Sequence, residues 1–70
     1  MKKEERYVIV PVWQKYILSV EEAAAYFGLG RDKVREMTDD PNSRLVLWNG
    51  SKRLIKRKRT EEFLDQQFSV

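Results

Sequence analysis

The residues whose number and spacing suggest a function are the basic side chains. Their clustering suggests that the protein binds a polyanion. Six of the eight residues from 52 to 59 are Lys or Arg. The wider segment from 41 to 60 holds seven basic residues and no acidic one, whereas the rest of the chain has seven basic and eleven acidic residues. Such a basic corner on an acidic body favours an anionic partner. A solvated charged face without a partner is the alternative.

Catalytic and metal-binding chemistry finds little support in the residue types. The 70 residues include no Cys and no His, which excludes a Cys/His zinc site and any triad built on those residues. The carboxylate pairs are sequence neighbours, and adjacent side chains on a helix diverge: Glu21 with Glu22, Asp39 with Asp40, and Glu61 with Glu62. No Ser, Thr or Lys has a partner that suggests activation. We therefore expect no enzyme activity and no cofactor.

A helix that begins after Ser19 is the first element expected to support the basic residues. The run from Ser19 to Glu22 fits a capping box, in which the Ser hydroxyl and the Glu carboxylate each accept from the other residue's backbone N–H. The three alanines that follow favour helix. Gly28 suits the left-handed position at the helix end.

A second helix is expected from Arg31 to Thr38, with Val34 and Met37 facing the first helix. Two short helices joined by a glycine-containing turn are typical of a helix-turn-helix. In that motif the N-terminal half of the second helix enters the major groove of DNA. The predicted contacts there are Arg31, Lys33 and Arg35. An exposed helix with ion pairs between its own neighbours is the alternative.

A β-hairpin follows the second helix. Turn-forming residues occupy Asp39 to Ser43, a strand is expected over Leu45–Trp48, and a returning strand over Arg53–Lys56. Asn49-Gly50 between them is a strong hairpin signal, because both residues tolerate positive φ. The sequence therefore predicts a hairpin that carries part of the basic run.

The hairpin and its exit supply the remaining candidate DNA contacts. A small polar tip with cations at its base fits a minor groove or a phosphate strand. The predicted wing residues are Asn49, Gly50, Ser51, Lys52 and Arg53, and the predicted backbone contacts are Lys56, Arg57 and Lys58. Neutralising about five phosphates predicts a log–log salt slope near −4.5. A hairpin edge protected from aggregation by positive charge is the alternative.

The remaining segments complete the expected fold. Tyr7–Val12 is expected to be extended, and Ile17 with Leu18 to form a short strand. A last helix is expected from Lys58 to Gln67, with Glu61 and Glu62 near its start favouring the helix dipole and with Phe63, Leu64 and Phe68 packed inward. The aromatic residues expected in or beside the core are Trp13, Tyr16 and Trp48.

These elements predict one α+β domain over residues 1–70: a small winged helix-turn-helix with a two-stranded hairpin wing and a C-terminal helix. Residues 1–6 are expected to be disordered. No segment offers the roughly 18 apolar residues of a membrane helix, and the charged start does not fit a signal peptide, so we expect a cytoplasmic protein. The absence of a long heptad pattern favours a monomer.

Four segments resemble one known family, the small excisionases of conjugative transposons. They are the lead-in PVWQKY at 11–16, LSVEEAAAYFGLG at 18–30, LWNG at 47–50 and IKRK at 55–58. The resemblance covers about residues 8 to 68. The helix-turn-helix alone is shared with many MerR-like regulators, whereas the lead-in joined to the hairpin and its exit is more specific.

The resemblance implies an architectural role. Such excisionases bind double-stranded DNA near the ends of a mobile element and bend it, which helps a separate tyrosine-type integrase to assemble the excision complex. The resemblance also places the same cations in the recognition helix, the wing and the backbone contacts. Two other functions stay open: a small MerR-like transcription regulator, and a protein-interaction module whose basic corner docks an acidic partner.

Overall fold

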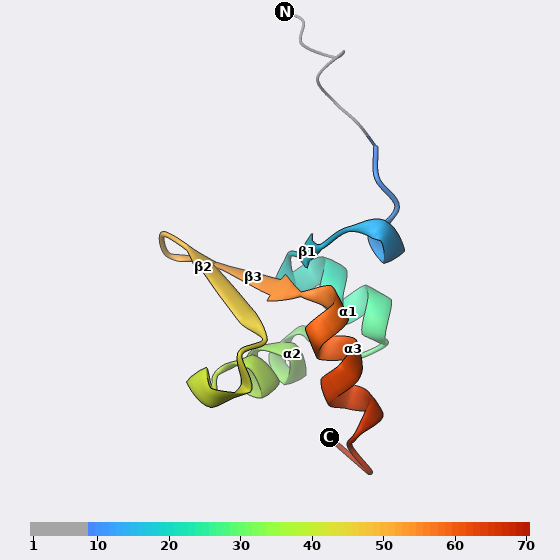
Figure 1. Cartoon of the computed structure of the whole chain (residues 1–70), viewed down its shortest axis with the longest axis vertical. Helices are drawn as coiled ribbons and strands as arrows, with labels where there is room; N and C mark the ends of the chain where they lie inside the picture. Colours follow the sequence, from blue (N-terminus) through green and yellow to red (C-terminus); the bar gives the residue numbers. More distant parts are fainter. Residues whose placement is uncertain (1–8) are drawn as a thin grey trace, which may run out of the picture.

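The computed structural model of the chain describes residues 9–70, and the expected disorder of residues 1–6 lies outside them. The described residues form an α+β fold of three helices, two 3-10 turns and a three-stranded sheet (Figure 1). Its elements are η2 Val12–Gln14, β1 Ile17–Leu18, α1 Val20–Phe27, α2 Arg31–Thr38, η3 Pro41–Ser43, β2 Val46–Asn49, β3 Lys52–Lys56 and α3 Arg57–Asp65. The predicted order of elements is confirmed.

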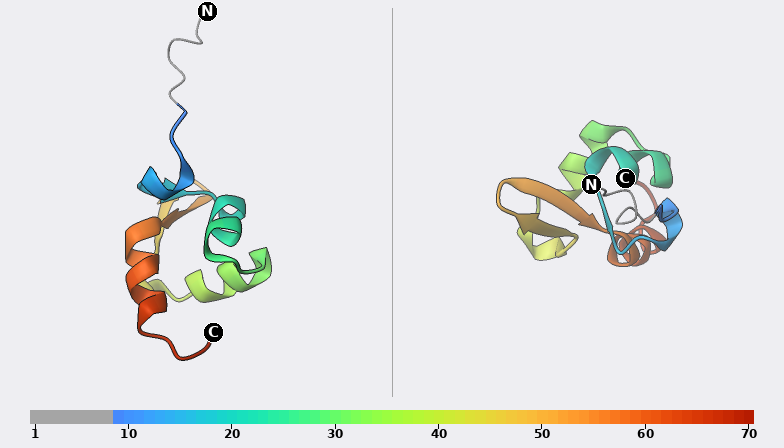
Figure 2. Two further views of the ribbon diagram at one scale, coloured as in Figure 1. Left: turned by 90° about the vertical axis from the view of Figure 1, so that its right-hand side faces the viewer. Right: turned by 90° about the horizontal axis from the view of Figure 1, so that it is seen from above.

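The antiparallel sheet has the strand order β1-β3-β2. The short strand β1 pairs with the end of β3, Leu18 opposite Ile55, so the sheet has three strands and not only the two of the predicted wing. Beyond that pairing, β2 and β3 continue as a two-stranded hairpin as far as Asn49 opposite Lys52. This hairpin projects from the rest of the fold (Figure 2). Helix α3 lies on one side of the fold, and the α1–α2 pair lies on the other (Figure 2).

Helix α1 begins and ends as its sequence predicts. The Ser19 hydroxyl accepts from the Glu22 backbone N–H at 3.1 Å, and the Glu22 carboxylate accepts from the Ser19 N–H at 3.0 Å. Gly28 closes the helix with φ +72°, in the left-handed region. That turn leads directly into α2, so the helix-turn-helix is confirmed.

A small aliphatic core joins the helix pair to the sheet. Its buried members are Leu18, Val20, Ala23, Ala24, Val34 and Ile55, with Val12, Phe27, Leu29 and Val46 packed around them. Thr38, and not the predicted Met37, is the second buried residue of α2, and Met37 is half-buried. The core is therefore built mainly from β1, α1, α2 and the inner end of β3.

Four aromatic residues that were expected in or against the core are largely exposed. Trp13, Tyr16 and Trp48 are 62%, 67% and 56% exposed, and Phe68 is fully exposed. In η2 it is Val12 that packs against the core. Trp48 lies on the projecting part of the hairpin, and Phe68 follows the end of α3. The predicted inward packing of Phe68 is wrong, and none of the other three is a buried member of the core.

Two local predictions shift by a residue. The loop of the hairpin is Gly50-Ser51, and only Gly50 has positive φ, +64°, as in a type II′ turn, whereas Asn49 ends β2. Helix α3 begins at Arg57, so its first turn contains no acidic residue and the predicted dipole role of the two glutamates is wrong. Within that helix Phe63 and Leu64 are half-buried.

Candidate nucleic-acid interface

A surface groove is shared by the second helix of the helix-turn-helix and the hairpin. Its charged and aromatic walls are Glu21 at the start of α1, Arg35 of α2, and Trp48, Lys52 and Arg53 of the hairpin. Ser19, Val20 and Ser51 complete the lining. The fold therefore brings the two predicted DNA-contacting elements to one surface.

The three cations predicted on α2 are held only loosely by acidic neighbours. Arg31 lies 3.8 Å from Glu21, Lys33 lies 3.3 Å from Glu36, and Arg35 lies 3.7 Å from Asp32. Charge-assisted N–H···O bonds are shorter, about 2.7–2.9 Å, and ion pairs this exposed stabilise little. These side chains are therefore available to an anionic ligand.

The hairpin tip is exposed from Asn49 to Lys52. Its type II′ loop carries no side chain larger than Ser, which allows close approach to a narrow surface. Among the ion pairs of residues 9–70, none involves Lys52. Lys52 is thus the cation of the tip that is free to meet phosphate.

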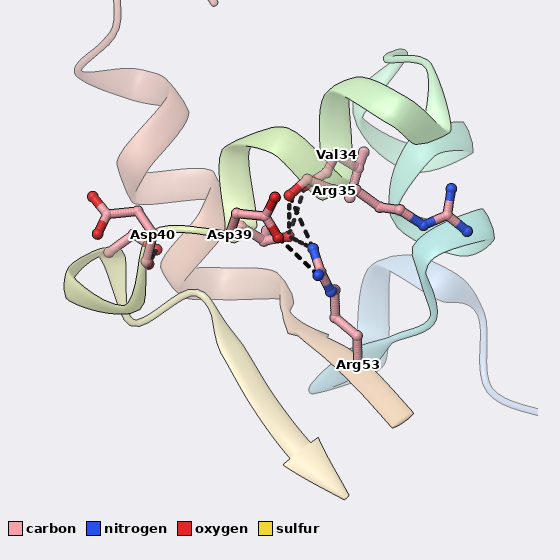
Figure 3. A network of polar contacts seen from close by, with 7 residues as sticks. Val34, Arg35, Asp39, Asp40 and Arg53 are labelled. Atoms are coloured by element: carbon pink, nitrogen blue, oxygen red, sulfur yellow. Dashed lines mark hydrogen bonds and ion pairs between the residues drawn. The ribbon is translucent and has the colours of Figure 1, made fainter. Parts of the chain in front are cut away.

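Arg53 differs from Lys52, although both were predicted as wing contacts. Its guanidinium donates to the Arg35 carbonyl at 2.9 Å, to the Thr38 hydroxyl at 2.9 Å and to the Asp39 carboxylate at 2.8 Å (Figure 3). It also lies 5.3 Å from the centre of the Trp48 ring, within reach of a cation–π interaction. Only 20% of the side chain is exposed.

Arg57, which was predicted to contact the DNA backbone, is also held by contacts within the protein. Its Nε donates to the Lys15 carbonyl at 2.6 Å and its Nη1 to the Glu61 carboxylate at 2.9 Å, and its side chain is 14% exposed. Glu61 accepts a further bond from the Tyr26 hydroxyl at 2.5 Å. This bond and the Arg57 charge lower the pKa of Glu61, and the same bond raises the pKa of Tyr26.

The other two predicted backbone contacts lie apart from the groove. Lys56 and Lys58 line a separate shallow pocket at the start of α3, together with Tyr16, Arg59 and Glu62. Arg59 is exposed there, although the sequence prediction left it out of the site. The predicted site thus divides into a groove and a second basic surface.

The sequence prediction missed the residues that hold the two arginines. Thr38 and Asp39 hold Arg53, and the Lys15 carbonyl, Tyr26 and Glu61 hold Arg57 directly or through one partner. These partners lie 14 to 42 residues away in sequence, apart from Glu61, which is one helical turn from Arg57. The spacing of Glu61 is the one signal that pointed to such a contact.

Other site types find no support within residues 9–70. No group of three or more acidic side chains there is placed to hold a metal ion. No helix of that part of the chain is both long and apolar enough to cross a membrane.

Comparison with known proteins gives two concordant findings. The whole chain, residues 1–70, matches the family described as the excisionase from transposon Tn916. A curated relative from Streptococcus agalactiae serotype V, also described as the excisionase from transposon Tn916, is 37% identical over 57 residues. That alignment covers 80% of this chain and 85% of the relative.

Proposed function

The chain belongs to the family of excisionases from transposon Tn916, and we propose on that basis that it binds the duplex ends of a mobile element and bends them. The bent DNA would allow a tyrosine-type integrase to assemble the complex that excises the element. In this proposal the protein is an architectural factor that catalyses no reaction and works as a monomer in the cytoplasm.

The observation that carries the proposal is the groove between α2 and the hairpin. Arg35 of α2 and Lys52 of the hairpin face the same groove. In a winged helix-turn-helix the second helix reads the major groove while an adjacent element reaches the neighbouring minor groove or phosphate strand. A shared groove is the arrangement that lets one duplex meet both elements.

The exposed cations of α2 and the hairpin tip have different tasks in this arrangement. Arg31, Lys33 and Arg35 would contact guanine edges or phosphates, since the Arg fork can bond either in bidentate fashion. Lys52 would neutralise a phosphate beside the Gly50-Ser51 loop. Sequence preference is therefore expected from α2 and general affinity from Lys52.

The basic surface at the start of α3 would extend the contact along the backbone. Lys56, Lys58 and Arg59 line one shallow pocket there. A protein that holds DNA at two separate surfaces gains contacts when the duplex curves toward both, and those contacts offset the bending cost of about 1–6 kcal/mol. This division of the basic residues supports the bending part of the proposal.

Fluorescence anisotropy tests DNA binding directly. One labelled duplex carries an end of the parent element and the other a scrambled sequence of the same composition, and both are titrated over a salt series. We expect tighter binding to the element end and a log–log slope near about −4.5. Equal binding to both duplexes contradicts site recognition, and no binding at low salt favours docking to an acidic protein partner.

An excision assay separates an excisionase from a transcription regulator with the same fold. Deleting the gene should abolish integrase-dependent excision and leave promoter output near the element unchanged. Förster transfer between dyes at the two ends of the duplex reports bending, and the dyes should approach on binding. Lost promoter control with normal excision would support the regulator.

A further inference from the structure

The outer half of the hairpin has few contacts of its own to fix its direction. Strand β1 pairs with β3 at Ile55 and Lys56, so within residues 9–70 the outer pairs Trp48–Arg53 and Asn49–Lys52 have no third strand beside them. An isolated two-stranded hairpin is marginally stable in water. Contacts from outside the sheet must therefore hold this segment in place relative to α2.

Arg53 provides such contacts from the outer half of the hairpin. Its planar guanidinium reaches the last turn of α2 and meets the Arg35 carbonyl, the Thr38 hydroxyl and the Asp39 carboxylate together. Figure 3 shows these bonds converging from one side, while the Arg35 side chain points away from them. One residue of the hairpin thus binds three acceptors, two in the last turn of α2 and one at its C-cap residue.

The acceptors at the end of α2 are oriented to bind a positively charged group. Thr38 is 4% exposed, and its hydroxyl donates to the Val34 carbonyl at 2.7 Å, which leaves its lone pairs facing Arg53. The C-terminal end of a helix also favours positive charge, because its last carbonyls lack partners. The site therefore selects an arginine fork over a single ammonium group.

We infer that Arg53 is a positioning residue, which clamps the hairpin to the C-terminal end of α2 and so sets the separation of the two DNA-contacting elements. The clamp consists of Arg53, the Arg35 carbonyl, Thr38 and Asp39. The inference rests on the proposed function, because the separation matters only if both elements meet one duplex. It reverses the sequence-based expectation that Arg53 itself contacts DNA.

Asp39→Asn distinguishes a clamping Arg53 from one that contacts phosphate, because the two roles predict different changes in DNA binding. Removing a negative charge near DNA tightens binding if Arg53 contacts phosphate, because Arg53 loses its competitor. If Arg53 is a clamp, the preference for the element end over the scrambled duplex falls about tenfold, the size expected for one charge-assisted hydrogen bond. Tighter binding with unchanged preference overturns the inference.

Asp40→Asn is the matched control for that variant. Asp40 is the adjacent carboxylate, it also lies exposed, and its Oδ1 accepts from the Asn42 N–H and not from Arg53. Figure 3 shows its carboxylate turned away from the clamp. Asparagine can accept the same bond, so the preference should stay as in the unaltered protein. An equal loss in both variants overturns the clamp.

Arg53→Lys separates charge from geometry. The variant keeps the positive charge but loses the fork, so a clamp predicts a lower preference with an unchanged salt slope. A phosphate contact predicts an unchanged preference for this variant, and a slope smaller by about 0.9 for Arg53→Ala. Circular dichroism melts identify a temperature at which every variant is folded, and binding is compared there.

Nuclear magnetic resonance tests the clamp without DNA. Residual dipolar couplings and heteronuclear NOEs of residues 47–53 should change in Asp39→Asn and Arg53→Lys but not in Asp40→Asn. If the unaltered protein does not distinguish the two duplexes, the proposed function fails, and these couplings still decide the clamp. A hairpin whose order and orientation are unchanged in both variants overturns it.

Discussion

Two arginines of the same basic run join different parts of the molecule. Arg53 connects the projecting hairpin to α2, whereas Arg57 connects α3 to the lead-in segment before β1. The carboxylate partner of Arg53, Asp39, is 67% exposed, and that of Arg57, Glu61, is 35% exposed. The Arg57 junction lies within the body, so its loss should lower stability the more, while loss of the Arg53 junction should lower stability less and mainly change the hairpin's orientation.

The difference teaches that a basic run is not one uniform DNA-binding patch. Lys52 and Lys58, next to these two arginines, are exposed. The forked donors of arginine suit fixed internal acceptors, and the flexible ammonium of lysine suits solvent and phosphate. In the proposed function, the arginines with fixed internal contacts hold the fold together, and the neighbouring exposed lysines bind the DNA.

The largest effect is expected from Arg57→Ala. It removes the bonds that Arg57 donates to the Lys15 carbonyl and to the Glu61 carboxylate, which keeps only its bond from Tyr26. Bonds to charged groups contribute about 1.5–3 kcal/mol each. The free energy of unfolding should fall by about 2 kcal/mol, which lowers the Tm by about 8–16 °C in a domain of this size. Thermal melts followed by circular dichroism measure this fall.

Lys58→Ala is the control for that change, because Lys58 is exposed and adjacent. Its free energy of unfolding should change by no more than about 0.5 kcal/mol, as is typical of surface substitutions, so its Tm should hardly change. An Arg57→Ala variant with an unchanged Tm and a smaller salt slope for DNA would show that Arg57 contacts the backbone, as the sequence first predicted.

A smaller loss, about 1 kcal/mol, is expected from Thr38→Val. The substitution keeps the shape of the side chain but removes the hydroxyl that accepts from Arg53 and donates to Val34. It should also weaken the preference for element-end DNA. Chemical denaturation measures the first effect, and anisotropy measures the second.

Thr60→Val provides the matched comparison. Thr60 is also buried, and its hydroxyl donates to the Lys56 carbonyl one turn back and not to either arginine. It should lose stability with no change in DNA preference. If both threonine variants lose preference equally, the effect comes from general loosening of the fold and not from the hairpin clamp.

The Arg57 junction should also give the protein a pH dependence. The bond from Tyr26 and the charge of Arg57 lower the pKa of Glu61 below its ordinary value, and the bonds from Lys15 and Ser19 lower the pKa of Glu22 in the same way. A lowered pKa stabilises the fold above the unfolded value and loses that contribution as the pH falls through the folded value. The Tm should therefore fall as the pH drops below about 5.

Glu61→Gln should reduce the fall of the Tm at acidic pH. The part of the fall that remains should come from Glu22. Glu62→Gln is the control, because the side chain of Glu62 is exposed beside Glu61 on the same helix. Melting curves at several pH values compare the pH dependence of the Tm in the two variants. Identical pH profiles for the two Gln variants would contradict the role given to Glu61.

The parts of the fold that the sequence could predict depend on local rules. The capping box at Ser19, the left-handed Gly28 and the hairpin glycine Gly50 each act on neighbouring residues, so their signals lie within a few positions. These signals were sufficient for the helix-turn-helix and the hairpin. They placed the hairpin loop one residue early because Asn49 and Gly50 both tolerate positive φ, and the chain uses only Gly50.

The residues that the sequence misplaced depend on distant contacts. Whether an aromatic side chain packs inward depends on whether the small core has room, and aliphatic side chains fill it, which leaves Trp13 and Trp48 exposed. Whether an arginine is free depends on acceptors from other elements, as Asp39 is for Arg53. Composition and charge therefore predicted a basic surface but not which of its cations remain available.

The smallest effect on stability, and the sharpest test of the contrast between the two basic residue types, is expected from Lys52→Ala. Lys52 pairs in register with Asn49 at the hairpin end, and its neighbour Arg53 is engaged with α2. The free energy of unfolding should therefore change by less than about 0.5 kcal/mol, so the Tm hardly changes, while the salt slope of DNA binding becomes smaller by about 0.9. Anisotropy over a salt series measures the slope. Arg53→Ala should show the reverse pattern, with a lower Tm and an unchanged salt slope. If the salt slope falls equally in both variants, both residues contact phosphate, and the contrast between exposed lysine and clamped arginine is wrong.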